Sequence, residues 1–272
     1  MYPHVHHRND QPILDVSKLS LRYDGRMALE GISFHLHAGE HVAVVGPNGA
    51  GKSTLFKLIA GVLTPTSGQV SVYGSGPRGH VCIAYIPQRS QVDWHFPVSV
   101  ADVVMMGRSA KLRPLSWPSK NDWQVVRQSL VTVELEGLAN RQIGQLSGGQ
   151  QQRMFIARAL AQEAELMLMD EPLAGLDTPS QEGLLSLLAR LHEKGVTVMV
   201  ATHDLQQAAQ YFDRILLINR QIIAFGTAEQ VLKPETLMQA YGGRLRLVEG
   251  ERGMLAMDDT CCEGDAEHEH AH

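Results

Sequence analysis

The sequence has few cysteines, no long apolar run and no excess of basic charge. Its three cysteines, two of them adjacent, are too few for a disulfide framework and favour a reducing compartment. No apolar run approaches the roughly 18 residues of a membrane-spanning helix, and the first residues lack the pattern of a signal peptide. The net charge of −5 gives no basic footprint for nucleic acid. We therefore expect a cytoplasmic globular protein that does not cross a membrane itself.

Strand-length apolar runs alternate with helical patterns along most of the 272 residues. This alternation predicts an α/β fold with a parallel sheet covered on both faces. Two or three short strands are expected within 13–36, and the other expected strands are 41–45, 69–73, 81–86, 166–169, 196–201 and 215–219. The expected helices are 53–60, 148–161, 180–193 and 205–212, with further helical segments between 98 and 140.

A glycine-rich loop follows the expected strand at 41–45. It fits the pattern G-x-x-x-x-G-K-[ST], with Gly46, Pro47, Asn48, Gly49, Ala50, Gly51, Lys52, Ser53 and Thr54. Glycines let backbone N–H groups point at phosphate oxygens, and the following helix directs its positive end at the same charge. We expect Lys52 to reach the β- and γ-phosphates and Ser53 to bind Mg²⁺. A plain turn is disfavoured because an apolar strand precedes the loop and an amphipathic helix follows it.

Two acids follow the apolar run at 166–169. Ligands bind at the carboxyl ends of the strands in open parallel sheets, which places Asp170 and Glu171 beside the nucleotide. Asp170 would hold Mg²⁺ directly or through water, and Glu171 would act as the general base that polarises the attacking water. A solvated turn is the alternative for the acids alone, but the phosphate loop upstream favours the functional interpretation.

The stretch Leu146-Ser147-Gly148-Gly149-Gln150 resembles the LSGGQ signature of ATP-binding-cassette (ABC) ATPases. Small residues before a helix N-terminus again suit an anion, although the same residues also make an ordinary helix cap. In that family the signature contacts ATP held by the other subunit. The resemblance therefore implies ATP and Mg²⁺ as cofactors and a homodimer with composite ATP sites.

Four further positions match the family pattern. The resemblance implies that Tyr23 stacks on adenine, Gln88 binds Mg²⁺ and reports to the permease, Asp177 bridges subunits, and His203 contacts the γ-phosphate. A tyrosine packed in a core and a structural histidine are the alternatives for the aromatic positions. The order of all the motifs favours the family interpretation.

The resemblance covers roughly residues 13–242 and implies the P-loop fold of ABC ATPases. We expect a parallel-sheet core, an antiparallel β subdomain and a small helical subdomain. The expected divisions are a polar segment at 1–12, an ABC ATPase domain at 13–245 with the helical subdomain inserted at about 91–160, and a disordered tail at 246–272.

A single cassette without long heptad segments is typical of a transporter subunit. ABC ATPases of DNA repair or translation, and those of another transporter class, are the alternatives. Residues 91–108 resemble the manganese, zinc and iron branch of importers. This implies a transmembrane permease and, indirectly, an extracytoplasmic metal-binding protein as partners, no nucleic acid, and a peripheral place on the cytoplasmic face of the membrane.

Soft metal-ligating side chains gather near both ends of the sequence. The tail has Cys261, Cys262, His268, His270 and His272, and the start has His4, His6 and His7. Thiolates and imidazoles prefer Zn²⁺, Cu⁺ and similar ions. A disordered histidine-rich tail and a purification remnant are equally open interpretations.

Overall fold

The structure, a computed structural model, describes residues 12–23, 25–76, 83–112 and 116–242, together with the backbone of 245–250 and 253–258. A six-stranded sheet runs through the middle of the protein in the order β5-β6-β7-β3-β8-β9. Its first five strands are parallel, and β9 pairs antiparallel with β8. The strands are β5 (Ile83–Ile86), β6 (Leu166–Asp170), β7 (Thr197–Ala201), β3 (His41–Val45), β8 (Arg214–Asn219) and β9 (Gln221–Gly226).

The three central strands β6, β7 and β3 are buried along their whole length. Helices or the second sheet cover both faces, so neither face of these strands selects polar residues. This is why these strands read as continuous apolar runs in the sequence. The predicted parallel α/β core is confirmed.

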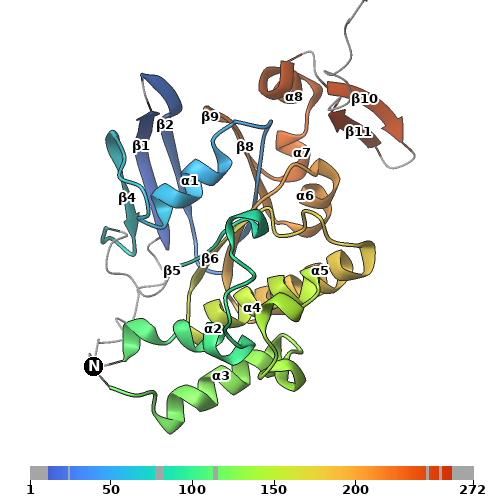
Figure 1. Ribbon diagram of the computed structural model, residues 1–272. Helices are drawn as coiled ribbons and strands as arrows, with labels where there is room; N and C mark the ends of the chain where they lie inside the picture. Colours follow the sequence, from blue (N-terminus) through green and yellow to red (C-terminus); the bar gives the residue numbers. More distant parts are fainter. Residues whose placement is uncertain are drawn as a thin grey trace, which may run out of the picture.

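A three-stranded antiparallel sheet lies beside this core. It has the order β2-β1-β4 and consists of β1 (Leu14–Tyr23), β2 (Arg26–Leu36) and β4 (Ser67–Val72). Helix α1 (Lys52–Ile59) lies against it (Figure 1), and the side chain of Phe56 is fully buried in a core shared with β1, β2 and β8. The ring of Phe34 on β2 meets that of Phe225 on β9 edge-on, 5.8 Å between centroids, and joins the two sheets.

Three helices inserted between β5 and β6 pack on one another. They are α2 (Val100–Met106), α3 (Lys120–Thr132) and α4 (Gly148–Ala161), and each begins at a serine whose side chain forms a reciprocal capping box. In the described part of this insertion, a short 3₁₀ helix at Arg89–Gln91 precedes α2, and others at Ser109–Lys111, Glu136–Leu138 and Ile143–Gln145 lie between the three helices. Helix α5 (Thr178–Glu193) follows β6, and α6 (Leu205–Tyr211) follows β7.

The chain after β8 holds more structure than its sequence predicted. Strand β9 is followed by α7 (Ala228–Val231) and α8 (Pro234–Tyr241), and then by an antiparallel hairpin of β10 (Leu245–Gly250) and β11 (Gly253–Asp258). The backbone of 245–250 and 253–258 is thus drawn as a hairpin, and our division of the chain into a domain at 13–245 and a disordered tail at 246–272 stays a prediction. Two short segments rich in apolar residues, 245–248 and 254–257, flank glycines at 250 and 253, which is a hairpin signal in an otherwise polar stretch. No helix in the described part of the chain is both long and apolar enough to cross a bilayer.

Candidate active site

The glycine-rich loop joins the end of β3 to the start of α1. Gly46 and Gly51 have φ angles of 155° and 99°, which strain any residue with a side chain. A Cβ atom on Gly46 would clash with the carbonyl oxygen of Ile218, and one on Gly51 would lie 2.9 Å from that of Ala28. Both neighbours are backbone atoms and cannot turn aside. The close packing of the loop against β8 and β2 therefore requires glycine at both positions.

The side chain of Lys52 curls back into this loop. Its Nζ atom donates to the carbonyl oxygen of Gly46 at 2.6 Å and to that of Pro47 at 3.2 Å, and the residue is only 6% exposed. No side chain of the described residues caps α1, which starts at Lys52. A buried ammonium and the open N-terminus of a helix thus meet at the loop, an arrangement suited to a phosphate.

Two hydroxyl groups hold the carboxylate of Asp170 at the end of β6. Ser53 donates to Oδ1 at 3.0 Å and Tyr85, on β5, donates to Oδ2 at 3.3 Å. Burial and the neighbouring carboxylate raise the pKa of Tyr85 above its ordinary value, so the phenol keeps its proton at neutral pH. Asp170 is 2% exposed, and the fold brings it to Ser53 from 117 positions away.

Glu171 turns out of the strand that carries Asp170. Its φ angle is 48°, a left-handed conformation that is uncommon for a residue with a side chain. Its N–H donates to the carbonyl oxygen of Ala201 at 3.0 Å, and its Oε2 accepts from Nε2 of Gln88 at 3.0 Å. Successive acids are thereby aimed at different partners, Asp170 at the phosphate loop and Glu171 at the segment after β5. Such local strain is typical of functional positions.

Ser147 caps the N-terminus of α4. Its N–H donates to Oε1 of Gln150 at 3.0 Å, and the N–H of Gln150 donates to the serine hydroxyl at 3.4 Å. Gly148 and Gly149 leave room for neighbouring side chains, because a Cβ atom would approach Arg89 Nη1 and Ser180 Oγ respectively to 2.8 Å. The local structure is compatible with an ordinary helix cap and also with an anion site, since Ser147 caps the helix and the helix begins with two glycines.

Three predicted residues lie apart from this cluster. Tyr23 is 46% exposed, and His203 and Asp177 are also exposed. His203 follows β7, whose Ala201 is paired with Asp170, so it emerges at the same edge of the sheet as the acids. Asp177 precedes α5. Among the described residues, none of the three makes a hydrogen bond to the phosphate loop or the acid pair.

Sequence reasoning missed two residues of this region. Tyr85 lies in an apolar strand and resembles a core residue, and Arg89 resembles an ordinary polar loop residue. The only sequence feature that could have marked Tyr85 as a site residue is that a polar hydroxyl occurs in this apolar strand, shortly before Pro87 and Gln88. Nothing in the local pattern marks Arg89, whose partner Gln151 lies 62 positions away.

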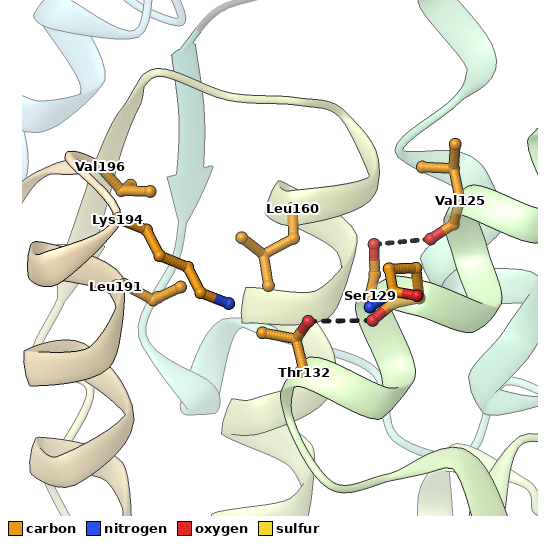
Figure 2. Close-up of a pocket in the computed structure, with 8 residues that line it drawn as sticks. Val125, Ser129, Thr132, Leu160, Leu191, Lys194 and Val196 are labelled. Atoms are coloured by element: carbon orange, nitrogen blue, oxygen red, sulfur yellow. Dashed lines mark hydrogen bonds between the residues drawn. The ribbon is translucent and has the colours of Figure 1, made fainter.

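A pocket of about 230 Å³ lies elsewhere, between α3, the end of α4 and the end of α5 (Figure 2). The hydroxyls of Ser129 and Thr132 are turned to backbone carbonyls of their own helix. None of its lining residues is a predicted site residue; they are Val125, Gln128, Ser129, Thr132, Leu160, Leu191, Lys194 and Val196. The histidines and cysteines near the ends (His4, His6, His7, Cys261, Cys262, His268, His270 and His272) fall outside the described residues. Within the described part no group of three or more His, Cys, Asp or Glu side chains could hold a metal ion.

Comparison with known proteins finds close relatives over most of the chain. Residues 29–174 match the family described as ABC transporter. The chain is 46% identical over 233 residues to the manganese transport system ATP-binding protein MntB of Bacillus subtilis (strain 168), covering 85% of this chain and 93% of that protein. It is 44% identical over 235 residues to the zinc transport system ATP-binding protein TroB of Treponema pallidum (strain Nichols), covering 85% and 88%.

Solved structures show the same fold. The dimeric structure of a post-hydrolysis state of the ATP-binding cassette MJ0796, bound to ADP and Pi, aligns with a TM-score of 0.69 at 28% identity. The alignment covers 79% of this chain and 98% of that one. The predicted α/β architecture is thus found in a protein with a bound nucleotide.

Proposed function

This chain belongs to the ABC transporter family of ATP-binding proteins, and on that premise we propose that it hydrolyses ATP to drive metal-ion import through a membrane permease. The contact between Ser53 and Asp170 is the observation that carries the ATPase proposal. It joins the phosphate loop to the acid strand across 117 positions, and Ser53 directly follows Lys52, whose ammonium is buried in the same loop. A glycine-rich turn with no ligand would not need all three groups in one place.

The phosphate loop would hold the nucleotide. Lys52 can exchange its two carbonyl partners for the β- and γ-phosphates, because both partners are neutral and a phosphate oxygen is a stronger acceptor. The backbone N–H groups at the start of α1 would bind the same phosphates. Tyr23 would stack on the adenine ring, since nearly half of its surface is open.

The residues around Asp170 fit Mg²⁺. The Ser53 hydroxyl and the Asp170 carboxylate are hard oxygen donors, and an oxygen set with few protein ligands is what Mg²⁺ prefers. The Gln88 amide oxygen would complete the set, since the amide nitrogen is the atom engaged with Glu171. When bound, Mg²⁺ neutralises charge on the β- and γ-phosphates. Tyr85 keeps Asp170 oriented for this role.

Glu171 would be the general base. Its carboxylate is held from one side by Gln88, which leaves the second oxygen to accept a proton from the attacking water. His203 emerges at the same sheet edge and would contact the γ-phosphate. In a dimer, the signature residues Ser147, Gly148, Gly149 and Gln150 of one chain would complete the ATP site of the other, with Asp177 at the boundary. The dimeric state of the related cassette supports this arrangement.

Metal import is supported by the relatives. One is a manganese transport protein and another a zinc transport protein, each more than 40% identical to this chain over most of its length. The coupling machinery would be a permease at the cytoplasmic face of the membrane, with an extracytoplasmic metal-binding protein supplying the ion. The chain would then be a peripheral subunit.

A source strain that carries Lys52→Ala tests both parts of the proposal. We expect the purified variant to lose MgATP hydrolysis, and the strain to hold less manganese, zinc or iron by elemental analysis. An increase of one metal would instead indicate an exporter. A strain whose contents of all three metals match the parent, at equal expression of the variant, would refute metal transport.

A further inference from the structure

The segment that follows Gln88 contacts the first two turns of α4. Nε of Arg89 donates to Oε1 of Gln151 at 2.6 Å. The indole of Trp94 donates to the carbonyl oxygen of Arg89 at 3.1 Å and meets the ring of Phe155 edge-on, 5.8 Å between centroids. Gln151 and Phe155 are one helical turn apart and share a face of α4. One short segment thus contacts one face of α4 at two residues, Gln151 and Phe155.

The guanidinium of Arg89 also lies against the start of the helix. A Cβ atom on Gly148 would come within 2.8 Å of Nη1, so the arginine covers the place where a side chain would stand. Its acceptor Gln151 is 3% exposed. A charge-assisted hydrogen bond that is shielded from water is stronger than an exposed one. Arg89 therefore sets where the first turn of α4 lies relative to β5.

The neighbouring residue makes the contact at the other end. Gln88 donates to Glu171 at 3.0 Å, and Arg89 is the next residue in the chain. The planar peptide group between them keeps their Cα atoms about 3.8 Å apart, so both contacts belong to one short stretch of backbone. A path of contacts therefore runs from Glu171 through Gln88 and Arg89 to Gln151, which follows the signature turn at 147–150.

We propose that Arg89 is a positioning residue that ties the catalytic acid of one ATP site to the signature turn that completes the other. The inference rests on the proposed function, because the signature turn matters for hydrolysis only in a dimer with composite sites. Arginine suits the position because its planar fork donates from Nε to Gln151 while Nη1 covers Gly148. A lysine ammonium is a single point and cannot make both contacts.

The test uses the full chain with Glu171→Gln, which we expect to form an ATP-bound dimer. Adding Arg89→Ala should raise the Kd of the dimer by about tenfold or more, the size of effect expected for one charged hydrogen bond. MgATP binding to the monomer, measured with a fluorescent nucleotide below the dimer Kd, should change less than about twofold. With Glu171 intact, Arg89→Ala should also lower the Hill coefficient of hydrolysis towards one. A purely structural role would not separate these quantities.

The matched control is Arg127→Ala, which removes an exposed arginine that pairs with Glu136 on the same helical subdomain. We expect no change in the dimer Kd. Gln151→Ala should reproduce most of the effect of Arg89→Ala, and the losses in the double variant should be less than additive, because both single changes break the same Arg89–Gln151 hydrogen bond. Arg89→Lys, which keeps the charge, should still weaken the dimer. If circular dichroism shows that Arg89→Ala is unfolded, Arg89→Lys takes its place in the test.

The outcomes separate the two levels of inference. If Glu171→Gln dimerises with ATP and its Kd is unchanged by Arg89→Lys and by Gln151→Ala, the role of Arg89 is refuted and the proposed function stands. Additive losses in the double variant would likewise refute the shared contact. If Glu171→Gln never dimerises with ATP, the composite site fails and this inference fails with it.

Discussion

The imidazole rings of His41 and His192 stack 4.1 Å apart between centroids, with their planes inclined by 25°. His41 is 2% exposed at the start of β3, and its Nε2 lies 3.1 Å from the carbonyl oxygen of Val196. Asp213 accepts from the backbone N–H of His41 at 2.9 Å and lies 3.3 Å from Nε2 of His192. Burial, aided by His192, lowers the pKa of His41 to about 4. The low pKa means that His41 resists protonation in the folded protein.

The lowered pKa of His41 predicts that the protein loses stability in mild acid. The unfolded chain binds a proton at His41 near pH 6.5 and the folded chain only near pH 4, so the stabilisation is present above pH 6.5 and is lost as the pH falls towards 4. The full difference is about 3 kcal/mol. Urea unfolding at pH 7.5 and pH 5 should show a smaller pH dependence for His41→Gln than for the parent. His95→Gln, at a fully open side chain, is the control. Equal pH dependence in His41→Gln and the parent would contradict the assignment.

Glu171→Gln should leave ATP binding intact and lower hydrolysis by about 100-fold or more, the usual cost of removing a general base. Lys52, Ser53 and Asp170 still hold the nucleotide, and a glutamine can still accept the hydrogen bond from Gln88. Hydrolysis is measured by phosphate release and binding with a fluorescent nucleotide. A variant that turns over ATP at the parent's rate would remove Glu171 from the role of base.

Hydrolysis should require two chains. Mixing a Lys52→Ala chain with a Ser147→Arg chain leaves one intact composite site in each heterodimer, whereas either homodimer has none. We expect the mixture to hydrolyse ATP faster than either variant alone. The parent's rate should also rise faster than linearly with protein concentration where dimers are scarce. A linear rise among confirmed monomers is the result that would count against a shared site.

Tyr85→Phe should raise the Mg²⁺ concentration needed for half-maximal hydrolysis. The change removes one of the two hydroxyls that hold Asp170, and one hydrogen bond contributes about 1 kcal/mol, or a factor of about five. Mn²⁺ binding by electron paramagnetic resonance with ATP present provides a readout independent of turnover. Tyr211→Phe, an exposed tyrosine on α6, is the control. An unchanged Mg²⁺ dependence in Tyr85→Phe would contradict the role of Tyr85, and would mean that the Ser53 hydroxyl alone suffices to orient Asp170.

The cysteines and histidines near the C-terminus should bind Zn²⁺ without contributing to ATP chemistry. Metal binding requires deprotonated ligands, so we expect affinity that weakens below about pH 6.5, where imidazoles become protonated. Isothermal titration of the full chain and of a chain ending at Asp258 compares the two directly. Equal Zn²⁺ stoichiometry in both would exclude the tail as a metal site, and a lower ATPase rate in the shortened chain would contradict its independence from ATP chemistry.

Local patterns were enough for most of the core elements. The apolar run at 41–45 coincides with β3, and the helix expected at 148–161 coincides with α4. Both signals act over a few residues, through burial on two faces in the strand and through the serine cap and apolar face in the helix. The segments after β8 were missed, because β9 is only partly buried and α7 has only four residues, too few for a period to show.

The sequence by itself determined the chemical groups of the candidate site, since the glycines and Lys52 follow one apolar strand and the two acids follow another. Only the tertiary structure decided which of them meet. Ser53 reaches Asp170 because β6 and α1 are neighbours in the fold, and Gln88 rather than a phosphate-loop residue faces Glu171. The contact of Arg89 with Gln151 has no sequence signal at all, because a hydrogen bond between distant residues depends on how the elements pack and leaves no local period or propensity in either segment.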